Sequence, residues 1–306
     1  MGTFVYNSAQ DEEHIFRSRA PAVQVPDNVT LPEFVLQNAE LYADNVAFVE
    51  AATGKKITYG RVCHSCFGNN GGWWGVFGSK SIGHASEIKK QVEVADAKII
   101  VTNGASYEKV KGFGVPVIVL GEEVIEGAMN WNNLLEAADR AGNKINKEEL
   151  KQSDLCALPF SSGTTGLSKG VMLTHRNLVA NLSSTLFGVT PEMIGKVTVL
   201  GLIPFFHIYG ITGICCATLR NKGKVVVMGR FELRAFLNAL VSQEVTYAPI
   251  VPPIILNLVK NPIVDEFDLS KLKLQAIMTA AAPLAPDVLK ISKTSSLVSK
   301  SKRHMD

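Results

Sequence analysis

Apolar residues recur with helical spacing in several parts of the chain. This period, close to 3.6 residues, predicts amphipathic helices at residues 86–97, 177–187, 231–244 and 252–261. In the third of these segments the apolar face consists of Leu233, Phe236, Leu237 and Leu240. Two adjacent prolines open the fourth, where a missing N–H is tolerated because the first helical turn has no acceptor for it.

Short apolar runs rich in β-branched residues lie between and beside the predicted helices. They predict strands at residues 98–104, 115–121, 155–160, 224–228, 246–251 and 274–279. Several of these runs are apolar throughout rather than alternating, which is typical of strands buried on both faces. Strands that alternate with helices therefore predict an α/β fold, with a mostly parallel sheet covered by helices on both sides.

Two segments follow neither pattern. Residues 66–80, CFGNNGGWWGVFGSK, are rich in glycine, asparagine and tryptophan and have no period. Residues 292–306, SKTSSLVSKSKRHMD, are polar and basic, and we expect them to be disordered.

The stretch between Lys196 and Arg220 contains no formally charged residue and is long enough to cross a bilayer. It also contains Pro204, His207 and several glycines, and an ordinary globular pattern flanks it. A buried strand, a loop and a buried helix in succession would give the same composition. We favour this globular interpretation, without a membrane span, and keep a membrane-spanning segment as the alternative.

Composition and charge narrow the function classes. Apolar residues make up 46% of the 306 residues, enough for a sizeable core. The 31 basic and 28 acidic residues form no polybasic stripe, so the charge does not indicate nucleic-acid binding. Five irregularly spaced cysteines indicate a reducing compartment, and the CHSC motif of Cys63 and Cys66 lacks a second ligand pair for zinc. The N-terminus lacks the basic and apolar regions of a secretory signal, so we expect a cytoplasmic protein.

The sequence SSGTTGLSKG, residues 161–170, carries the clearest chemistry. Gly163 and Gly166 allow backbone N–H groups to converge on one point, which creates a concavity for an anion. Four hydroxyl groups add hydrogen-bond donors, those of Ser161, Ser162, Thr164 and Thr165. Lys169 adds a positive charge that suits phosphate oxygens. The spacing is not that of a Walker A loop, but the density of donors favours phosphate binding over a flexible surface turn.

The longer segment LPFSSGTTGLSKGVMLTHRNLVANL resembles the signature loop of the adenylate-forming enzymes, and specifically that of plant 4-coumarate:CoA ligases and their acyl-activating relatives. Other stretches resemble the same family, at residues 14–60, 203–211, 246–273 and 277–288. The resemblance implies that residues 1–291 form an incomplete N-terminal domain of the adenylate-forming fold. Residues 61–80 would then be an irregular junction, and residues 292–306 a tail foreign to the family.

The resemblance implies an acid–thiol ligase that works in two steps. A carboxylate would attack the α-phosphorus of ATP to give an acyl adenylate and pyrophosphate, and the thiol of CoA would then displace AMP. Mg²⁺ would accompany ATP, and the acid would be a hydroxycinnamate or a fatty acid. Catalysis would rest on positioning and on neutralising phosphate charge. Some full-length relatives of this kind are peroxisomal rather than cytoplasmic.

The match also implies roles for individual residues. Residues 161–166 and Lys169 would cradle the β- and γ-phosphates, and His207 would lie near the carboxylate and the α-phosphate. A buried structural histidine is the alternative for His207. The wall of the acyl pocket would comprise Ile208, Tyr209, Met278, Ala280 and Ala281. Ala282 and Pro283 would face adenine.

The chain departs from the family pattern in several places. Ser168 and Ala280 stand where many members have proline and glycine. After Val62, a segment of about one βα unit is missing, which would leave a strand of the sheet unpaired. The family's Tyr-Gly-x-Thr-Glu segment, its ribose-binding aspartate and its small domain with the catalytic lysine have no match. We therefore expect a truncated ligase of impaired or absent activity, without a CoA site; the alternative is a non-catalytic remnant that binds only nucleotide or a partner.

Overall fold

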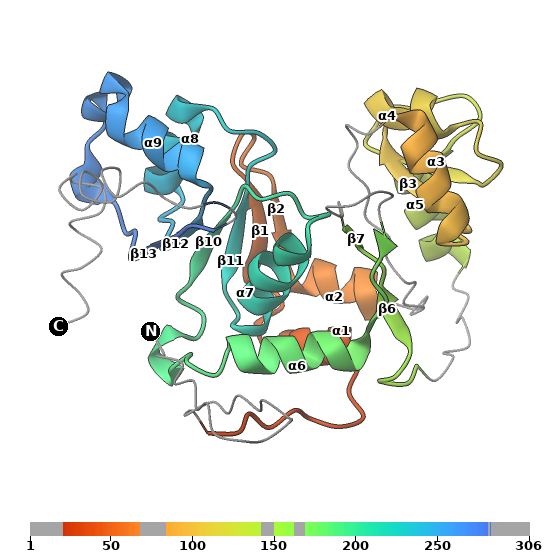
Figure 1. Ribbon diagram of the computed structural model, residues 1–306, viewed down its shortest axis with the longest axis horizontal. Coiled ribbons are helices and arrows are strands. Elements are labelled where there is room, and N and C mark those ends of the chain that lie inside the picture. The colour runs from red at the N-terminus through yellow and green to blue at the C-terminus, as the bar shows by residue number, and fades with distance from the viewer. Residues whose placement is uncertain (1–20, 68–83, 142–149, 162–168, 281, 283–306) are drawn as a thin grey trace, which may run out of the picture.

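A six-stranded sheet forms the centre of the computed structural model, which describes residues 21–67, 84–141, 150–161, 169–280 and 282 (Figure 1). The strand order is β13 (Ala276–Met278), β12 (Tyr247–Pro249), β10 (Thr198–Gly201), β11 (Lys224–Val227), β1 (Val46–Glu50) and β2 (Lys56–Thr58). Neighbouring strands are parallel, except that β2 runs antiparallel to β1. The predicted α/β class with a mostly parallel sheet is confirmed.

Smaller sheets flank the central one. A parallel sheet consists of β3 (Ile100–Asn103), β4 (Val117–Leu120) and β5 (Met129–Asn130). Two antiparallel pairs follow in the chain, β6 (Leu155–Ala157) with β9 (Leu173–Thr174) and β7 (Phe160–Ser161) with β8 (Lys169–Gly170). The second pair brackets the glycine-rich loop.

Helices cover these sheets. The α-helices are α1 (Leu31–Val35), α2 (Tyr59–Phe67), α3 (Ala85–Val94), α4 (Gly104–Val110), α5 (Trp131–Ala141), α6 (His175–Thr185), α7 (Ala217–Arg220), α8 (Leu233–Ser242) and α9 (Pro252–Lys260). Short 3₁₀ helices are η1 (Ala39–Tyr42), η2 (Pro191–Met193), η4 (Pro262–Glu266) and η5 (Leu269–Lys271), and η3 (Gly210–Cys216) is a π-helix. Figure 1 shows α3, α4 and α5 around the three-stranded sheet, and α8 and α9 beside β12 and β13.

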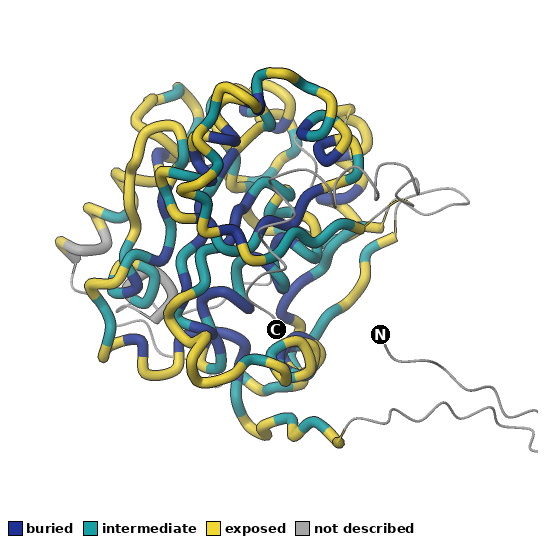
Figure 2. The backbone as a smooth tube through the Cα atoms, turned by 90° about the vertical axis from the view of Figure 1, so that its left-hand side faces the viewer, coloured by how far each residue is buried: buried dark blue, intermediate teal, exposed yellow. Residues whose placement is uncertain are grey.

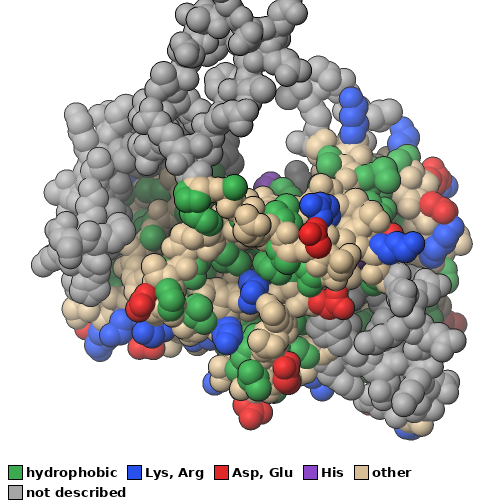
Figure 3. Space-filling model, turned by 90° about the horizontal axis from the view of Figure 1, so that it is seen from below, with side chains coloured by type: hydrophobic (Ala, Val, Ile, Leu, Met, Phe, Trp, Pro, Cys, Tyr) green, Lys and Arg blue, Asp and Glu red, His purple; other side chains and the backbone are tan. Residues whose placement is uncertain are grey.

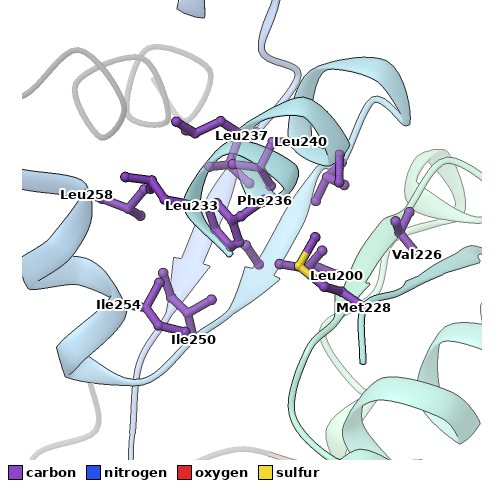
Figure 4. Close-up of a cluster of buried hydrophobic side chains, with 14 of the residues drawn as sticks. Leu200, Val226, Met228, Leu233, Phe236, Leu237, Leu240, Ile250, Ile254 and Leu258 are labelled. Atoms are coloured by element: carbon purple, nitrogen blue, oxygen red, sulfur yellow. The ribbon is translucent and has the colours of Figure 1, made fainter. Parts of the chain in front are cut away.

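The largest cluster of buried apolar side chains lies between the central sheet and helices α8 and α9 (Figure 4). The apolar face predicted for residues 231–244 is confirmed, because Leu233, Phe236, Leu237 and Leu240 are all buried. Phe236 is fully buried and belongs to the same cluster as Leu200 of β10. Burial of such side chains is the main favourable contribution to folding.

The opposite face of the sheet is also covered. Val199 and Val225 point away from their chain neighbours Leu200 and Val226, and they pack with Ile214 of the π-helix η3. Both faces of β10 and β11 are therefore apolar and buried, which explains why their sequences are apolar throughout. Figure 2 shows buried segments of the chain in the interior, surrounded by exposed segments.

The structure corrects the predicted strand at residues 155–160. This run splits into β6 and β7, and both parts lie in antiparallel pairs outside the central sheet. Pro159 lies at the break, because proline has no N–H to donate to a ladder. Its carbonyl oxygen accepts a hydrogen bond from the N–H of Val171 (2.9 Å), the residue after β8, so the chain already pairs with this segment at Pro159.

Two further sequence patterns can be compared with the structure. Asn103 is the last residue of β3 and also the N-cap of α4. Its side chain accepts a hydrogen bond from the Ser106 N–H (3.0 Å). The uncharged stretch between Lys196 and Arg220 contains a strand, a loop and helices, as the favoured globular interpretation predicted: β10, η3 and the first residues of α7. In the described residues, no helix is both long and apolar enough to cross a membrane. Of the two aperiodic segments, Cys66 and Phe67 end α2, and residues 68–80 and 292–306 lie outside the described residues.

A buried histidine joins α1 to α6 and predicts a pH dependence of stability. Nδ1 of His175 accepts a hydrogen bond from the Leu31 N–H (3.1 Å), which requires this nitrogen to be unprotonated. Burial lowers the pKa of His175 below 6.5, against the opposing influence of Asp154 and Glu33. The unfolded chain therefore binds a proton more readily than the folded chain, and stability falls as the pH falls below about 6.5.

His175→Asn keeps a hydrogen-bond acceptor for the Leu31 N–H but has no group that titrates in this pH range. We therefore expect its stability to fall less than that of the wild type as the pH is lowered. The measurement is the urea midpoint of both proteins between pH 7 and pH 5. Equal slopes for the two proteins would show that another group causes the pH dependence.

Candidate functional site

The glycine-rich loop is closed by a two-stranded hairpin. In the ladder of β7 and β8, Phe160 pairs with Gly170 and Ser161 pairs with Lys169. The Ser161 hydroxyl also donates to the Lys169 carbonyl oxygen (3.5 Å). The two ends of the loop are thus held side by side, as the phosphate-binding hypothesis requires. The remaining predicted phosphate ligands lie outside the described residues: Ser162, Gly163, Thr164, Thr165 and Gly166.

The described part of the hairpin fits a polyphosphate chemically. Ser161 and Lys169 are exposed at the end of the hairpin that borders the glycine-rich loop. Among the described ion pairs, none includes Lys169, so its charge is not neutralised by a neighbouring carboxylate there. An ammonium group beside a hydroxyl and a glycine-rich backbone is a suitable donor set for phosphate oxygens.

The strands that flank the hairpin, β6 and β9, and the histidine segment contact one core cluster. Cys156 and Ala157 of β6 are buried in this cluster, and Leu173 of β9 packs against it. Ile208, which follows His207, packs against the same cluster. The role of Ile208 in an acyl pocket stays a prediction. Burial raises the pKa of the Cys156 thiol to about 11, which makes it a structural residue rather than a nucleophile at neutral pH.

His207 lies in a tight turn before η3. Its N–H donates to the Pro204 carbonyl oxygen (3.0 Å), and its own carbonyl oxygen accepts from the Ile211 N–H (3.1 Å). Nδ1 of its ring accepts from the Tyr209 N–H (3.1 Å). This hydrogen bond assigns the ring proton of neutral His207 to Nε2. The side chain is exposed rather than buried, so Nε2–H is available as a donor to a bound molecule.

Three side chains from different elements meet beside this turn. The Tyr209 hydroxyl lies 3.4 Å from the Tyr247 hydroxyl and 3.5 Å from Sδ of Met278. The Tyr247 hydroxyl donates to the same sulfur atom (3.0 Å). Burial, followed by the hydrogen bond with Tyr247, raises the pKa of Tyr209, so its phenol is neutral at physiological pH. The structure thus brings together the predicted residues Tyr209 and Met278.

Tyr247 was not among the residues predicted from the sequence. The available signal was a tyrosine in a strand that is otherwise apolar, TYAPIV. Its register shows why it matters, because Tyr247 pairs with Val199 and therefore faces η3 together with that residue. Of the other predicted residues, Ala280 and Ala282 are exposed, whereas Ala281 and Pro283 lie outside the described residues.

Two glycines allow the close packing around Tyr209. A Cβ on Gly213 would lie 2.5 Å from Cε2 of the Tyr209 ring. A Cβ on Gly210 would overlap the Pro204 carbonyl oxygen and lie 2.8 Å from the Phe205 Cα atom. The glycine spacing in IYGITGI therefore lets the π-helix approach both the histidine turn and the tyrosine ring. Such π-helical segments are frequent at functional sites.

The described residues hold no group of three or more histidine, cysteine or acidic residues that could bind a metal ion. Cys63, Cys156, Cys215 and Cys216 form no disulfide bonds among the described residues. Figure 3 shows one face of the molecule, on which Lys and Arg side chains lie among Asp and Glu side chains rather than in a patch of one sign.

Comparisons with known proteins identify relatives of the chain. The chain is 61% identical over 312 residues to the 4-coumarate–CoA ligase-like 1 of Arabidopsis thaliana, and the match covers 92% of this chain and 57% of that protein. Because 312 exceeds the 306 residues of this chain, the relative has residues without a counterpart here. The chain therefore spans a little over half the length of this relative.

Solved structures share the fold. An anthranilate–CoA ligase in complex with anthranoyl-AMP superposes with a TM-score of 0.73 at 17% identity, covering 88% of this chain and 58% of the other. ATP-bound MatB from Rhodopseudomonas palustris superposes with a TM-score of 0.68 at 21% identity, over 88% of this chain and 58% of the other. The family profile described as AMP-binding enzyme matches residues 83–295. This match includes the hairpin, the histidine turn and the Tyr209–Met278 contact, and the chain belongs to the family of AMP-binding enzymes.

Proposed function

We propose that this chain forms the ATP- and acid-binding part of an acid–CoA ligase, which activates a carboxylate as an acyl adenylate. The observation that carries the proposal is the β7–β8 hairpin, which presents Ser161 and Lys169 in register at the ends of a glycine-rich loop. The shared core cluster, which joins the base of this hairpin to the segment after His207, supports a single site. The match to the AMP-binding family supports the same chemistry.

Lys169 and the hairpin would act on the phosphates. The Lys169 ammonium, the Ser161 hydroxyl and the loop amides would bind the oxygens of the β- and γ-phosphates. Their positive potential reduces the repulsion between the polyphosphate and an approaching carboxylate. The same contacts hold the α-phosphorus in place for attack, so that positioning contributes to the rate.

His207 would act as a hydrogen-bond donor. In the first step a carboxylate oxygen forms a bond to the α-phosphorus, and the bond from phosphorus to the pyrophosphate oxygen breaks. A carboxylate is already ionised at neutral pH, so this step needs no base. The Nε2–H of neutral His207 is exposed and suits an oxygen of the α-phosphate or of the carboxylate. Met278 and Tyr209 would line the site for the acid, a hydroxycinnamate or a fatty acid.

Mg²⁺ would enter with ATP and would neutralise phosphate charge; the exposed oxygen and amine donors of the hairpin are compatible with such a complex. CoA would be the acceptor of the acyl group in the complete reaction. The free thiols among the described cysteines support a reducing compartment such as the cytosol.

A polypeptide of these 306 residues is expected to bind ATP·Mg²⁺ without releasing acyl-CoA. Its sequence has no match to the ribose-binding aspartate, the Thr-Glu pair or the catalytic lysine that the family resemblance implies. A non-catalytic protein that binds only nucleotide is the second candidate, and the same missing residues favour it.

Two measurements on the 306-residue chain test the proposal. ATP·Mg²⁺ at about 100 times its dissociation constant would stabilise the folded state by about 2.7 kcal/mol, which a thermal shift detects. ATP–pyrophosphate exchange with a panel of cinnamic and fatty acids would detect adenylation. A shift with slow or absent exchange is the expected result. The absence of a thermal shift up to millimolar ATP would rule out the proposed site. ATP–pyrophosphate exchange followed by release of acyl-CoA would rule out the expectation that the 306-residue chain is inactive.

A further inference from the structure

The three-stranded sheet beside α3, α4 and α5 has an open edge at β3 (Figure 1). In the described part of the chain, β4 is the strand that pairs with β3. The Ile100 N–H donates to the Pro116 carbonyl oxygen (2.9 Å), which precedes β4. Backbone groups of successive residues in a strand point to alternate sides, so the N–H and C=O of Val101 point away from β4. They lie on the edge of the described sheet, where a further strand would bind.

Helices cover the two faces of this sheet unequally. Ile100, Val117 and Val119 lie on one face and pack with side chains of α3 and α4 in an apolar cluster. None of the described residues in this cluster belongs to α5, which contacts β4 and β5 instead. The second face is therefore covered beside β4 and β5 and left open beside β3.

The open part of the second face is apolar. Val101 is paired with Ile118, and Ile118 with Met129, so these three side chains share a face. Leu120 and Ile99 lie on the same face, because residues two apart in a strand point the same way. Of these five residues only Ile118 is buried. The other four are exposed, and we call them the β3 strip: Ile99, Val101, Leu120 and Met129.

The edge lacks the usual protection against pairing with another chain. Edge strands that stay free carry charged side chains, proline or a bulge. Residues 99–103, Ile-Ile-Val-Thr-Asn, contain neither charge nor proline, and the register of β3 with β4 has no irregularity. The charge before them, Lys98, forms an ion pair with Asp96 (2.6 Å). An apolar edge of this kind is typical of an interface with another strand.

A second copy of the chain fits this edge, because Val101 is complementary to itself. In an antiparallel pair, two residues directly opposite each other exchange both N–H···O bonds. Two copies of Val101 would form such a pair if a two-fold axis passed between them. Lys98 would then lie opposite Gly104, and Ile99 opposite Asn103, so that no like charges face each other across the axis. The two β3 strips would meet as one apolar surface.

We propose that the chain forms a two-fold symmetric dimer through β3, in which the two three-stranded sheets join into one continuous sheet. The same patch of both copies forms the interface, so the assembly closes at two chains. The backbone hydrogen bonds at Val101 and the burial of the two β3 strips stabilise it. The dimer does not depend on the proposed function, since neither the β7–β8 hairpin nor the His207 turn belongs to this surface.

The mass of the protein in solution tests the proposal. Sedimentation velocity of the 306-residue chain should show monomers at low micromolar concentration and dimers at high micromolar concentration. Val101→Lys places two ammonium groups at the axis, and Val101→Glu places two carboxylates there. Each variant alone should dimerise about tenfold more weakly or worse, because like charges then face each other. An equimolar mixture of the two variants should dimerise again, because a lysine then faces a glutamate.

Val94→Lys is the matched control. Val94 is 74% exposed on α3, the helix that packs on the other face of the sheet, so this variant adds the same charge outside the interface. It should dimerise like the wild type. Val101 is 52% exposed in the single chain, so its charged variants should fold, and a thermal melt checks this. Hydrogen exchange of the wild type needs no variant: the Val101 amide should exchange more slowly at high than at low protein concentration.

Each other outcome counts against the proposal. A chain that stays monomeric, or a Val101 amide whose exchange does not depend on concentration, would overturn it. A dimer that is unchanged in Val101→Lys would place the interface elsewhere on the molecule. Open-ended aggregates would contradict a closed two-fold pair. A mixture of the lysine and glutamate variants that stays monomeric would show that Val101 does not face its own copy.

Discussion

Replacing Lys169 with alanine is expected to weaken the binding of ATP to the chain by about 10- to 100-fold, the range for one lost hydrogen bond to a charged group. The residue stands opposite Ser161 at the last rung of the β7–β8 ladder, and its side chain is exposed. Because no described ion pair competes for its charge, the ammonium group is available to phosphate oxygens. Isothermal titration with ATP·Mg²⁺ measures the change.

Lys55→Ala is the control for the loss of one positive charge. Lys55 is exposed in the turn between β1 and β2 and is remote in sequence from the hairpin. This variant should bind ATP within about twofold of the wild type, because solvent and salt screen an exposed charge that makes no direct contact with the ligand. If both alanine variants lost the same small factor, ATP binding would depend on net charge and not on a contact with Lys169.

Gly210→Ala is expected to lower the free energy of unfolding by about 2–4 kcal/mol. The new Cβ would overlap the Pro204 carbonyl oxygen and crowd the Phe205 Cα atom, and both are backbone atoms that cannot rotate away. The turn that they form carries His207, so the same variant should also weaken acid binding. Alanine has a better helix propensity than glycine by about 1 kcal/mol. A net decrease in the free energy of unfolding must therefore come from this steric overlap.

Gly188→Ala is the matched glycine variant, because a Cβ at this position would meet no atom within 4 Å. Its stability should differ from the wild type by less than about 0.5 kcal/mol, as for other surface substitutions. Urea unfolding of the three proteins gives the comparison. A Gly210→Ala protein as stable as Gly188→Ala would mean that the histidine turn does not approach η3 as closely as described.

The sequence predicted the central elements because their patterns are local. The face of α8 repeats with helical spacing, and β11 and β12 have apolar runs because helices cover both faces of the sheet. The errors arose where pairing partners decide the structure. The run 155–160 has the composition of a buried strand, but Pro159 and the partner β9 divide it. The cap at Asn103 is a local hydrogen bond that hydrophobic periodicity does not reveal, and the π-helical form of η3 depends on close packing that periodicity does not contain.

In the candidate site, too, some features follow from the local sequence and others depend on residues distant in the chain. Residue types alone indicated the phosphate hairpin, since glycines, hydroxyls and a lysine in one short stretch have few other uses. The exposure of His207 and its hydrogen bond from the Tyr209 N–H needed the structure. Tyr247 could not be found from its own segment, because its partners Tyr209 and Met278 are 38 and 31 residues away in the chain.

The central claim is that the hairpin of β7 and β8 holds the triphosphate of ATP. A crystal structure of the 306-residue chain with a non-hydrolysable ATP analogue and Mg²⁺ tests it most directly. We predict density for the β- and γ-phosphates within hydrogen-bond distance of Nζ of Lys169 and of the glycine-rich loop, with the α-phosphate directed toward His207. A triphosphate bound elsewhere on the molecule, with Lys169 in solvent, would contradict the account.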